Sequence, residues 1–354
     1  MKKYFILLLV IAFSAQTLLA QNTCADLMRA IKQNNILQVE TLIKPGDVNC
    51  VDKKSDPRTP LLLATRKGAS DIAILLINAG ADVNYHHSGD ESPLMAATAS
   101  GMSEVVDLMI TKGANVKEEV RGDGTPLLAA AKHDQYEIAK RLIENGADVN
   151  AIVKGDGTAL GNACSRGYTA IAKLLLENGA NPALGNRSDG YPLMNAAAKG
   201  NTEIVQLLVN KGVDINEAFW GDGTALIIAA KRGHFNLVKT IVALGADIDK
   251  GIWGDGNPLI MAISRNHKDI ATFLIEQGAD VNYEISGDET PLIKACAYGY
   301  FDLVKQLIAN GADVNQSSRD GYFFNSRLYT PLKMARKFEY PNIEKYLIEH
   351  GATN

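Results

Sequence analysis

The sequence is poor in cysteine, histidine and aromatic residues. It has four cysteines and six histidines among 354 residues, and Phe, Trp and Tyr make up 6%. So few cysteines cannot build a disulfide-rich scaffold. Lysine and arginine total 36 against 40 acidic residues, a balance that argues against the basic surface needed to bind nucleic acid. With 46% hydrophobic and 21% charged residues, the composition is that of a globular protein.

The chain also lacks the short motifs of catalysis and any long apolar run. No HExxH, GxSxG, CxxC or P-loop pattern occurs, and no Ser, Cys or His stands in the context of a catalytic triad. No stretch approaches the roughly 18 consecutive apolar residues of a transmembrane helix. We therefore predict a protein that is not an enzyme, needs no cofactor, binds no metal and has no membrane span.

The first twenty residues have the layout of a secretory signal peptide. Lys2 and Lys3 precede an unbroken apolar run from Tyr4 to Phe13, and Ala20 stands before Gln21. The run is too short to span a bilayer. We expect cleavage after Ala20 and export to a periplasm or to the cell exterior, with residues 21–354 forming one continuous domain.

A 33-residue period organises the rest of the chain. The triplet Thr59-Pro60-Leu61 or a close relative recurs every 33 residues, except for a last step of 40 that indicates a seven-residue insertion near residues 317–329. A second motif, Gly-Ala-Asp-Val-Asn at residues 80–84, keeps the same phase. The triplet begins at residues 59, 92, 125, 158, 191, 224, 257, 290 and 330.

Each period predicts two short helices. Thr125 is suited to cap a helix whose first turn holds Pro126, where the missing N–H has no cost. A glycine such as Gly167 suits the left-handed residue that ends this helix. A second amphipathic segment follows, as at residues 138–143, and ends at Gly146. The polar, glycine-bearing residues before the next triplet have the length of a projecting hairpin.

These motifs resemble the ankyrin repeat family, over about Cys24 to Asn354. The resemblance implies an all-α solenoid of about ten helix-turn-helix units with β-hairpin fingers. It also implies a concave face, made of the fingers and the first-helix ends, that binds other proteins. One departure is that the position usually held by histidine after the triplet is apolar, as at Leu62 and Ile227, so that packing must replace its hydrogen bond.

Several residues that could carry chemistry are interpreted as structural. Cys164 and Cys296 occupy the same repeat position and are expected to be buried, inert thiols. His234 and His267 follow a first helix, where the family usually has histidine. His86 and His87 are expected at a solvated fingertip. The aspartates of the recurring Gly-Asp-Gly motif, such as Asp156, are expected to cap their own turns, because repeats about 10 Å apart cannot share one ion between them.

Cations and tryptophans that recur at fixed positions of successive repeats indicate a candidate binding face. Cations end several first helices, although the helix dipole favours them there in any case. The two tryptophans stand at the finger position of successive repeats, where they either anchor a partner or shield the next finger. We predict a monomer whose binding centre attracts another protein with an acidic surface and consists of Trp220, Trp253, Arg187, Lys199, Arg232 and Arg265.

Two alternatives stay open at this point. The tryptophan pair could instead bind a small ligand or a carbohydrate by stacking on sugar rings. The aromatic insertion from Tyr322 to Tyr329 could be a cap over the last core or a second docking patch.

Export to an oxidising compartment would make Cys24 and Cys50 the one credible disulfide pair. Cys24 precedes the first predicted helix, and Cys50 follows the end of the same repeat. The fingers of adjacent repeats could also hold the two sulfurs too far apart to bond.

Overall fold

The structure is a computed structural model that describes residues 24–43, 47–51, 58–86, 91–185, 190–219, 223–252, 256–284, 289–319 and 328–353. Almost all regular structure in these ranges is helical, which confirms the predicted all-α solenoid. The chain divides into two compact units, Met1–Gly190 and Tyr191–Asn354, which are described separately below.

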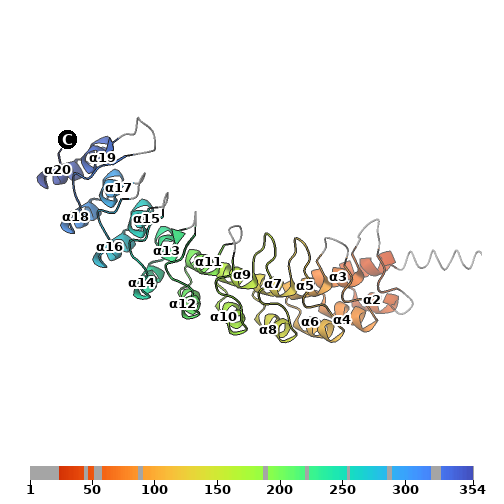
Figure 1. The fold of residues 1–354 in the computed structure, drawn as a ribbon. Coiled ribbons are helices and arrows are strands. Elements are labelled where there is room, and N and C mark those ends of the chain that lie inside the picture. Colours follow the sequence, from red (N-terminus) through yellow and green to blue (C-terminus); the bar gives the residue numbers. More distant parts are fainter. Residues whose placement is uncertain are drawn as a thin grey trace, which may run out of the picture. The chain divides into compact units, whose positions relative to one another are not determined.

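The first unit consists of short helices in two rows (Figure 1). The first helix of each repeat packs against the first helix of the next, and the second helices form the other row. The helices are a segment at residues 24–32, α2 (Ile36–Ile43), α3 (Pro60–Arg66), α4 (Ser70–Asn78), α5 (Pro93–Ala99), α6 (Ser103–Thr111), α7 (Pro126–Lys132), α8 (Tyr136–Glu144), α9 (Ala159–Arg166) and α10 (Thr169–Glu177).

The second unit repeats this arrangement. Its first helices, α11 to α19 in odd numbers, form one row, and its second helices form the other. The elements are α11 (Pro192–Lys199), α12 (Thr202–Asn210), β1 (Ala218–Phe219), β2 (Gly223–Thr224), α13 (Ala225–Arg232), α14 (Phe235–Ala243), α15 (Pro258–Ser264), α16 (Lys268–Glu276), α17 (Pro291–Ala297), α18 (Phe301–Ala309), β3 (Ser318–Arg319), β4 (Leu328–Tyr329), α19 (Pro331–Lys337) and α20 (Pro341–Glu349).

Short antiparallel pairings precede several first helices. Strand β1 pairs with β2, and β3 pairs with β4. Single bridges join Val120 to Gly124, Val153 to Gly157 and Ile252 to Gly256. These pairings lie where the sequence predicts fingers, and parts of several of these loops lie outside the described residues.

The triplet residues begin the first helices as expected. The hydroxyl of Thr125 accepts a hydrogen bond from the N–H of Leu128 at 3.1 Å, and Pro126 occupies the first turn. Gly167 follows α9 in the left-handed conformation at φ 80°. Where the repeat has no glycine at this place, Asp134 and Asn266 adopt the same conformation at φ 56° and 63°.

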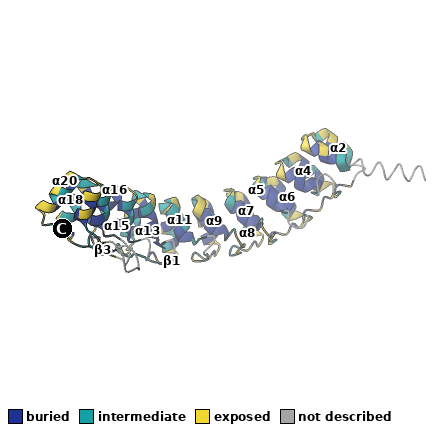
Figure 2. Ribbon diagram, turned by 90° about the horizontal axis from the view of Figure 1, so that it is seen from above, coloured by how far each residue is buried: buried dark blue, intermediate teal, exposed yellow. Residues whose placement is uncertain are grey.

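The core of each unit lies between the two rows of helices. Leu, Ile and Ala side chains of the first helices are almost fully buried, and buried residues follow the faces where helices meet (Figure 2). Cys164 and Cys296 are 0% exposed, and burial raises the pKa of both thiols. This environment fits the interpretation of both residues as inert.

An asparagine ladder, which the sequence did not reveal, links neighbouring repeats. The Asn that ends each Gly-Ala-Asp-Val-Asn motif bonds to the next repeat at both ends of its amide. Asn84 Nδ2 donates to Gly113 O at 3.0 Å, and its Oδ1 accepts from Asn115 N at 2.8 Å. Asn49, Asn150, Asn282 and Asn315 make the equivalent pair of bonds.

Several predicted features lie outside the described residues. They include the predicted signal peptide of residues 1–20 and most of the insertion near 317–329. In the part of the chain that the structure does describe, no helix is both long and apolar enough to cross a membrane.

Candidate protein-interaction surface

Three of the six predicted binding residues form a row in the second unit. Lys199 and Arg232 are the last residues of α11 and α13, and Arg265 is the C-cap of α15. Each lies eight residues after the N-cap of its helix, at 191, 224 and 257. Since α11 packs against α13 and α13 against α15, the three positions are neighbours in register. The other three predicted residues, Trp220, Trp253 and Arg187, lie outside the described residues.

The charges of this row are not neutralised within the described part of the chain. Lys199, Arg232 and Arg265 are exposed, and none of them forms an ion pair with a described carboxylate. Some other first-helix cations do have carboxylate partners. Arg66 bonds to Glu91 at 2.6 Å, and Lys294 lies 3.2 Å from Glu289. The row therefore presents three exposed positive charges that no described carboxylate compensates.

Two aromatic residues continue the same register, and the sequence analysis missed them. Tyr298 and Phe338 are the C-caps of α17 and α19, eight residues after the N-caps at 290 and 330. Their exposed fractions are 44% and 45%, which is high for large apolar side chains. The triplet phase contained this signal, because Tyr298 follows Arg265 by 33 residues. Only Phe338 departs from a simple 33-residue count, because the insertion before Thr330 makes the last step 40 residues.

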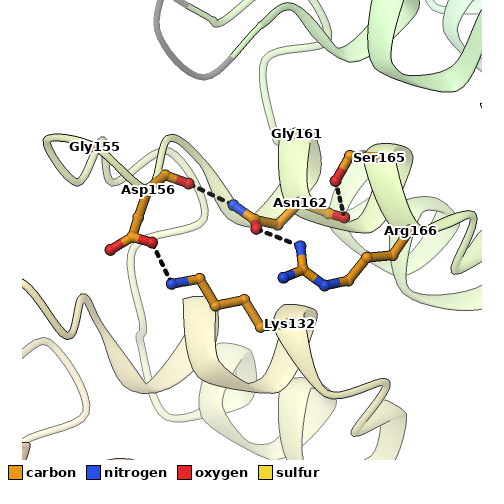
Figure 3. Close-up of a pocket in the computed structure, with 7 residues that line it drawn as sticks. All are labelled: Lys132, Gly155, Asp156, Gly161, Asn162, Ser165 and Arg166. Carbon is orange, nitrogen blue, oxygen red and sulfur yellow. Dashed lines mark hydrogen bonds and ion pairs between the residues drawn. The ribbon is translucent and has the colours of Figure 1, made fainter. Parts of the chain in front are cut away.

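The first unit has an open pocket of about 290 Å³ between α7, α9 and the loop before α9 (Figure 3). Gly161 stands where other repeats have a bulky apolar residue such as Leu128 or Ile227, so no side chain fills this space. The lining residues are Lys132, Gly155, Asp156, Gly161, Asn162, Ser165 and Arg166.

The polar groups of this pocket bond mainly to one another. Lys132 forms an ion pair with Asp156, and Asn162 Nδ2 donates to Asp156 O at 2.5 Å. Asn162 Oδ1 accepts from Arg166 Nη1 at 2.7 Å (Figure 3). Ser165 Oγ donates to Asn162 O at 3.0 Å, so it is not aligned with a base. At Asp156 the turn-capping interpretation was wrong, because the carboxylate bonds instead to Lys132 of the preceding repeat.

Comparison with known proteins establishes the family. A family model described as ankyrin repeats in three copies matches residues 27–120, 117–186, 160–252, 251–318 and 286–354. The chain belongs to the ankyrin repeat family. Among solved structures it is similar to the human ASB11 ankyrin repeat domain, with 28% identity over 63% of this chain and 99% of that chain and a TM-score of 0.56. Comparison with curated protein sequences finds no match.

The histidines of the ankyrin repeats have structural surroundings. The His234 ring lies against Gly200, and its Nε2 is 3.0 Å from Ala198 O. His86 Nε2 lies 2.8 Å from Glu118 Oε1 of the next repeat. Within the described ranges, no cluster of three or more His, Cys, Asp or Glu side chains could hold a metal ion.

Cys24 and Cys50 are joined by a disulfide in the first ankyrin repeat of the structure. Their Cα atoms are 5.9 Å apart, inside the usual range for such a bond. The bond connects the helix at residues 24–32 to the segment at residues 47–51. The distance between adjacent fingers, which the sequence left open, therefore does not separate the two sulfurs.

Proposed function

We propose that this protein is an exported ankyrin-repeat module that binds another protein with an acidic surface. Ankyrin repeats bind other proteins, and their fold is typically a non-enzymatic interaction scaffold. In this proposal the chain acts as a monomer of about ten units with hairpin fingers. It holds its partner on the concave face that the fingers and first-helix ends form.

The observation that carries the proposal is the exposed row of Lys199, Arg232 and Arg265, which has no ion-pair partner among the described residues. Cations at helix C-termini are common, because the dipole favours them. Three exposed cations at one register of adjacent helices, none of them paired with a described carboxylate, also concentrate positive charge on one face of a chain whose formal charge is −4. Such a concentration of charge steers an acidic partner toward this face and raises the association rate.

Export is supported by two independent features. The first is the arrangement of Lys2, Lys3, the apolar run and Ala20 at the start of the sequence. The second is the disulfide between Cys24 and Cys50, because disulfides persist in oxidising compartments and are rare in the cytosol.

The proposal is tested by reversing the charge of the row. The variant carries Lys199→Glu, Arg232→Glu and Arg265→Glu, and partners are captured by crosslinking in the native compartment. Its matched control carries Lys112→Glu, Lys173→Glu and Lys211→Glu, which replaces exposed lysines of second helices or their caps with the same change in net charge. We expect the first variant to lose the partner and the control to keep it. Equal capture by both variants would overturn the proposal.

The tryptophans separate the proposed function from its alternative. In the proposal, Trp220 and Trp253 are finger anchors beside Arg187, whereas in the alternative they stack on a carbohydrate or small ligand. The double variant Trp220→Ala with Trp253→Ala should reduce protein capture without loss of folding stability. Glycan binding that is unaffected by protein competitors and by salt would favour the alternative instead.

A further inference from the structure

We infer that the first-helix ends of the second unit bind an extended partner segment in which acidic residues are followed by apolar residues. This inference rests on the proposed function and deepens it, because it specifies the chemistry and spacing of the bound segment. The row that carries it consists of Lys199, Arg232, Arg265, Tyr298 and Phe338, and is called the graded row below.

The graded row is one structural register across five successive repeats. Its members lie eight residues after N-caps 191, 224, 257, 290 and 330. The helices α11, α13, α15, α17 and α19 pack against one another in that order (Figure 1). Packed helices stand about 10 Å apart, so the five side chains recur at about this spacing.

The two ends of the row differ in chemistry. The first three positions carry exposed cations that have no ion-pair partner among the described residues. The last two carry aromatic rings that are exposed by 44% and 45%. The change falls between Arg265 on α15 and Tyr298 on α17, which are adjacent helices. A matching ligand is therefore acidic at one end and apolar at the other.

Both aromatic rings are held by neighbours before any partner arrives. Tyr298 stacks on Tyr300 with ring centroids 5.6 Å apart. Lys337 Nζ lies 5.1 Å from the centre of the Phe338 ring. A side chain that is already restrained loses less conformational entropy on binding, which makes it a better anchor.

The spacing of the row matches one turn of an extended polyproline II partner. A polyproline II segment has three residues per turn and rises about 3.1 Å per residue, so one turn advances about 9.3 Å. Every third side chain then points the same way and meets the next repeat. In a β-strand, side chains three residues apart point to opposite faces and cannot follow the row. The bound segment therefore has acidic side chains at successive third positions, followed by apolar side chains at the next ones.

The probe is a synthetic peptide with this register. It has glutamate at three successive third positions, leucine at the next two third positions and proline elsewhere, and it is made in both chain directions. The control peptide has the same composition, with the glutamates and leucines moved to every second position. Binding to the purified protein is measured by fluorescence anisotropy. We expect one of the two register peptides to bind about tenfold or more tightly than the control. Equal affinity of the register and control peptides would overturn the inference.

Variants of the aromatic end test the anchors. Tyr298→Ser and Phe338→Ser should each weaken the register peptide about tenfold. Tyr298→Phe keeps the ring and should retain full affinity. Tyr136→Ser is the matched control, because Tyr136 is 39% exposed at the start of the second helix α8, away from the row. Thermal unfolding identifies any variant that has lost its fold. If Tyr298→Ser is unfolded, the peptide affinity of Phe338→Ser decides the result. Unchanged affinity in a folded Phe338→Ser variant would contradict the inference.

Failure of this inference can be told from failure of the proposed function. In one outcome, the charge-reversed variant loses its native partner, whereas the two serine variants keep theirs and bind both peptides equally. The proposed function then stands, and the inference about the graded row is wrong. If the register peptide binds as expected but charge reversal leaves native capture intact, the row recognises this chemistry and the proposed native role of the face is wrong.

Discussion

Replacing Asp249 with asparagine should stabilise the protein at neutral pH. Asp249 occupies a position of the asparagine ladder, and its Oδ1 accepts a hydrogen bond from Asp280 N at 2.9 Å. The equivalent Asn282 also donates from Nδ2 to Gly311 O at 2.9 Å. An ionised aspartate has no hydrogen to donate to the corresponding carbonyl of Gly278. Burial, together with the charges of Asp280 and Asp247, raises the pKa of the Asp249 carboxyl group.

The size of the effect follows from one added hydrogen bond and one removed charge. A hydrogen bond contributes about 1 kcal/mol net, so Asp249→Asn should raise the free energy of unfolding by about 1–2 kcal/mol at pH 7. A carboxyl group whose folded pKa is raised destabilises the wild type increasingly as pH rises from the unfolded pKa through the folded one. The gain should therefore be small below about pH 3, where Asp249 is mostly protonated in both states, and reach its plateau near neutrality.

The assay is urea denaturation of both proteins at acidic and neutral pH, followed by circular dichroism. The control is Asp302→Asn on α18, where the hydrogen bond from Lys305 lowers the pKa of an exposed carboxyl group. Because folding favours the ionised form of Asp302, replacing this residue with asparagine should not raise the free energy of unfolding at pH 7. A gain for Asp249→Asn that is independent of pH, or a loss of stability at pH 7, would refute the reasoning.

Three further predictions concern the ladder, the disulfide and the leader. Asn84→Ala removes two hydrogen bonds between repeats and should lower the free energy of unfolding in urea by about 1–3 kcal/mol. Asn145→Ala is the control, because the Asn145 amide bonds only within its own helix end, and it should lower the free energy of unfolding by less. Cys50→Ser should destabilise the first repeat by about 3 kcal/mol. Thiol counting in the unfolded wild type should find two free thiols, and a count of four would disprove the bond. Intact mass of the exported protein should begin at Gln21, and retention of residues 1–20 would contradict the proposed signal peptide.

Much of the fold could be predicted because its determinants are local. Capping residues such as Thr125 and glycines such as Gly167 act within a few residues, so the 33-residue pattern indicates where helices start and end. The ladder could not be predicted in this way. Asn84 bonds to Gly113 and Asn115, about one repeat later in the sequence, and only the stacking of repeats brings these groups together.

The candidate site was predicted only in part, for a similar reason. The register of Lys199, Arg232 and Arg265 follows from the repeat period. Whether each cation has a partner depends on the neighbouring repeat, as the bond between Arg66 and Glu91 shows. Asp156 illustrates the same limit, because its carboxylate pairs with Lys132 of the preceding repeat and not with its own turn.

Site-specific photo-crosslinking tests the central claim most directly. A photoreactive amino acid replaces Arg232 on the row in one variant and Lys173 on the second helix α10 in the other, and both are irradiated in the native compartment. The account predicts that position 232 crosslinks a discrete acidic protein, that excess salt or the register peptide removes the crosslink, and that position 173 gives none. A salt-insensitive crosslink of the same protein at position 173, with none at 232, would contradict it.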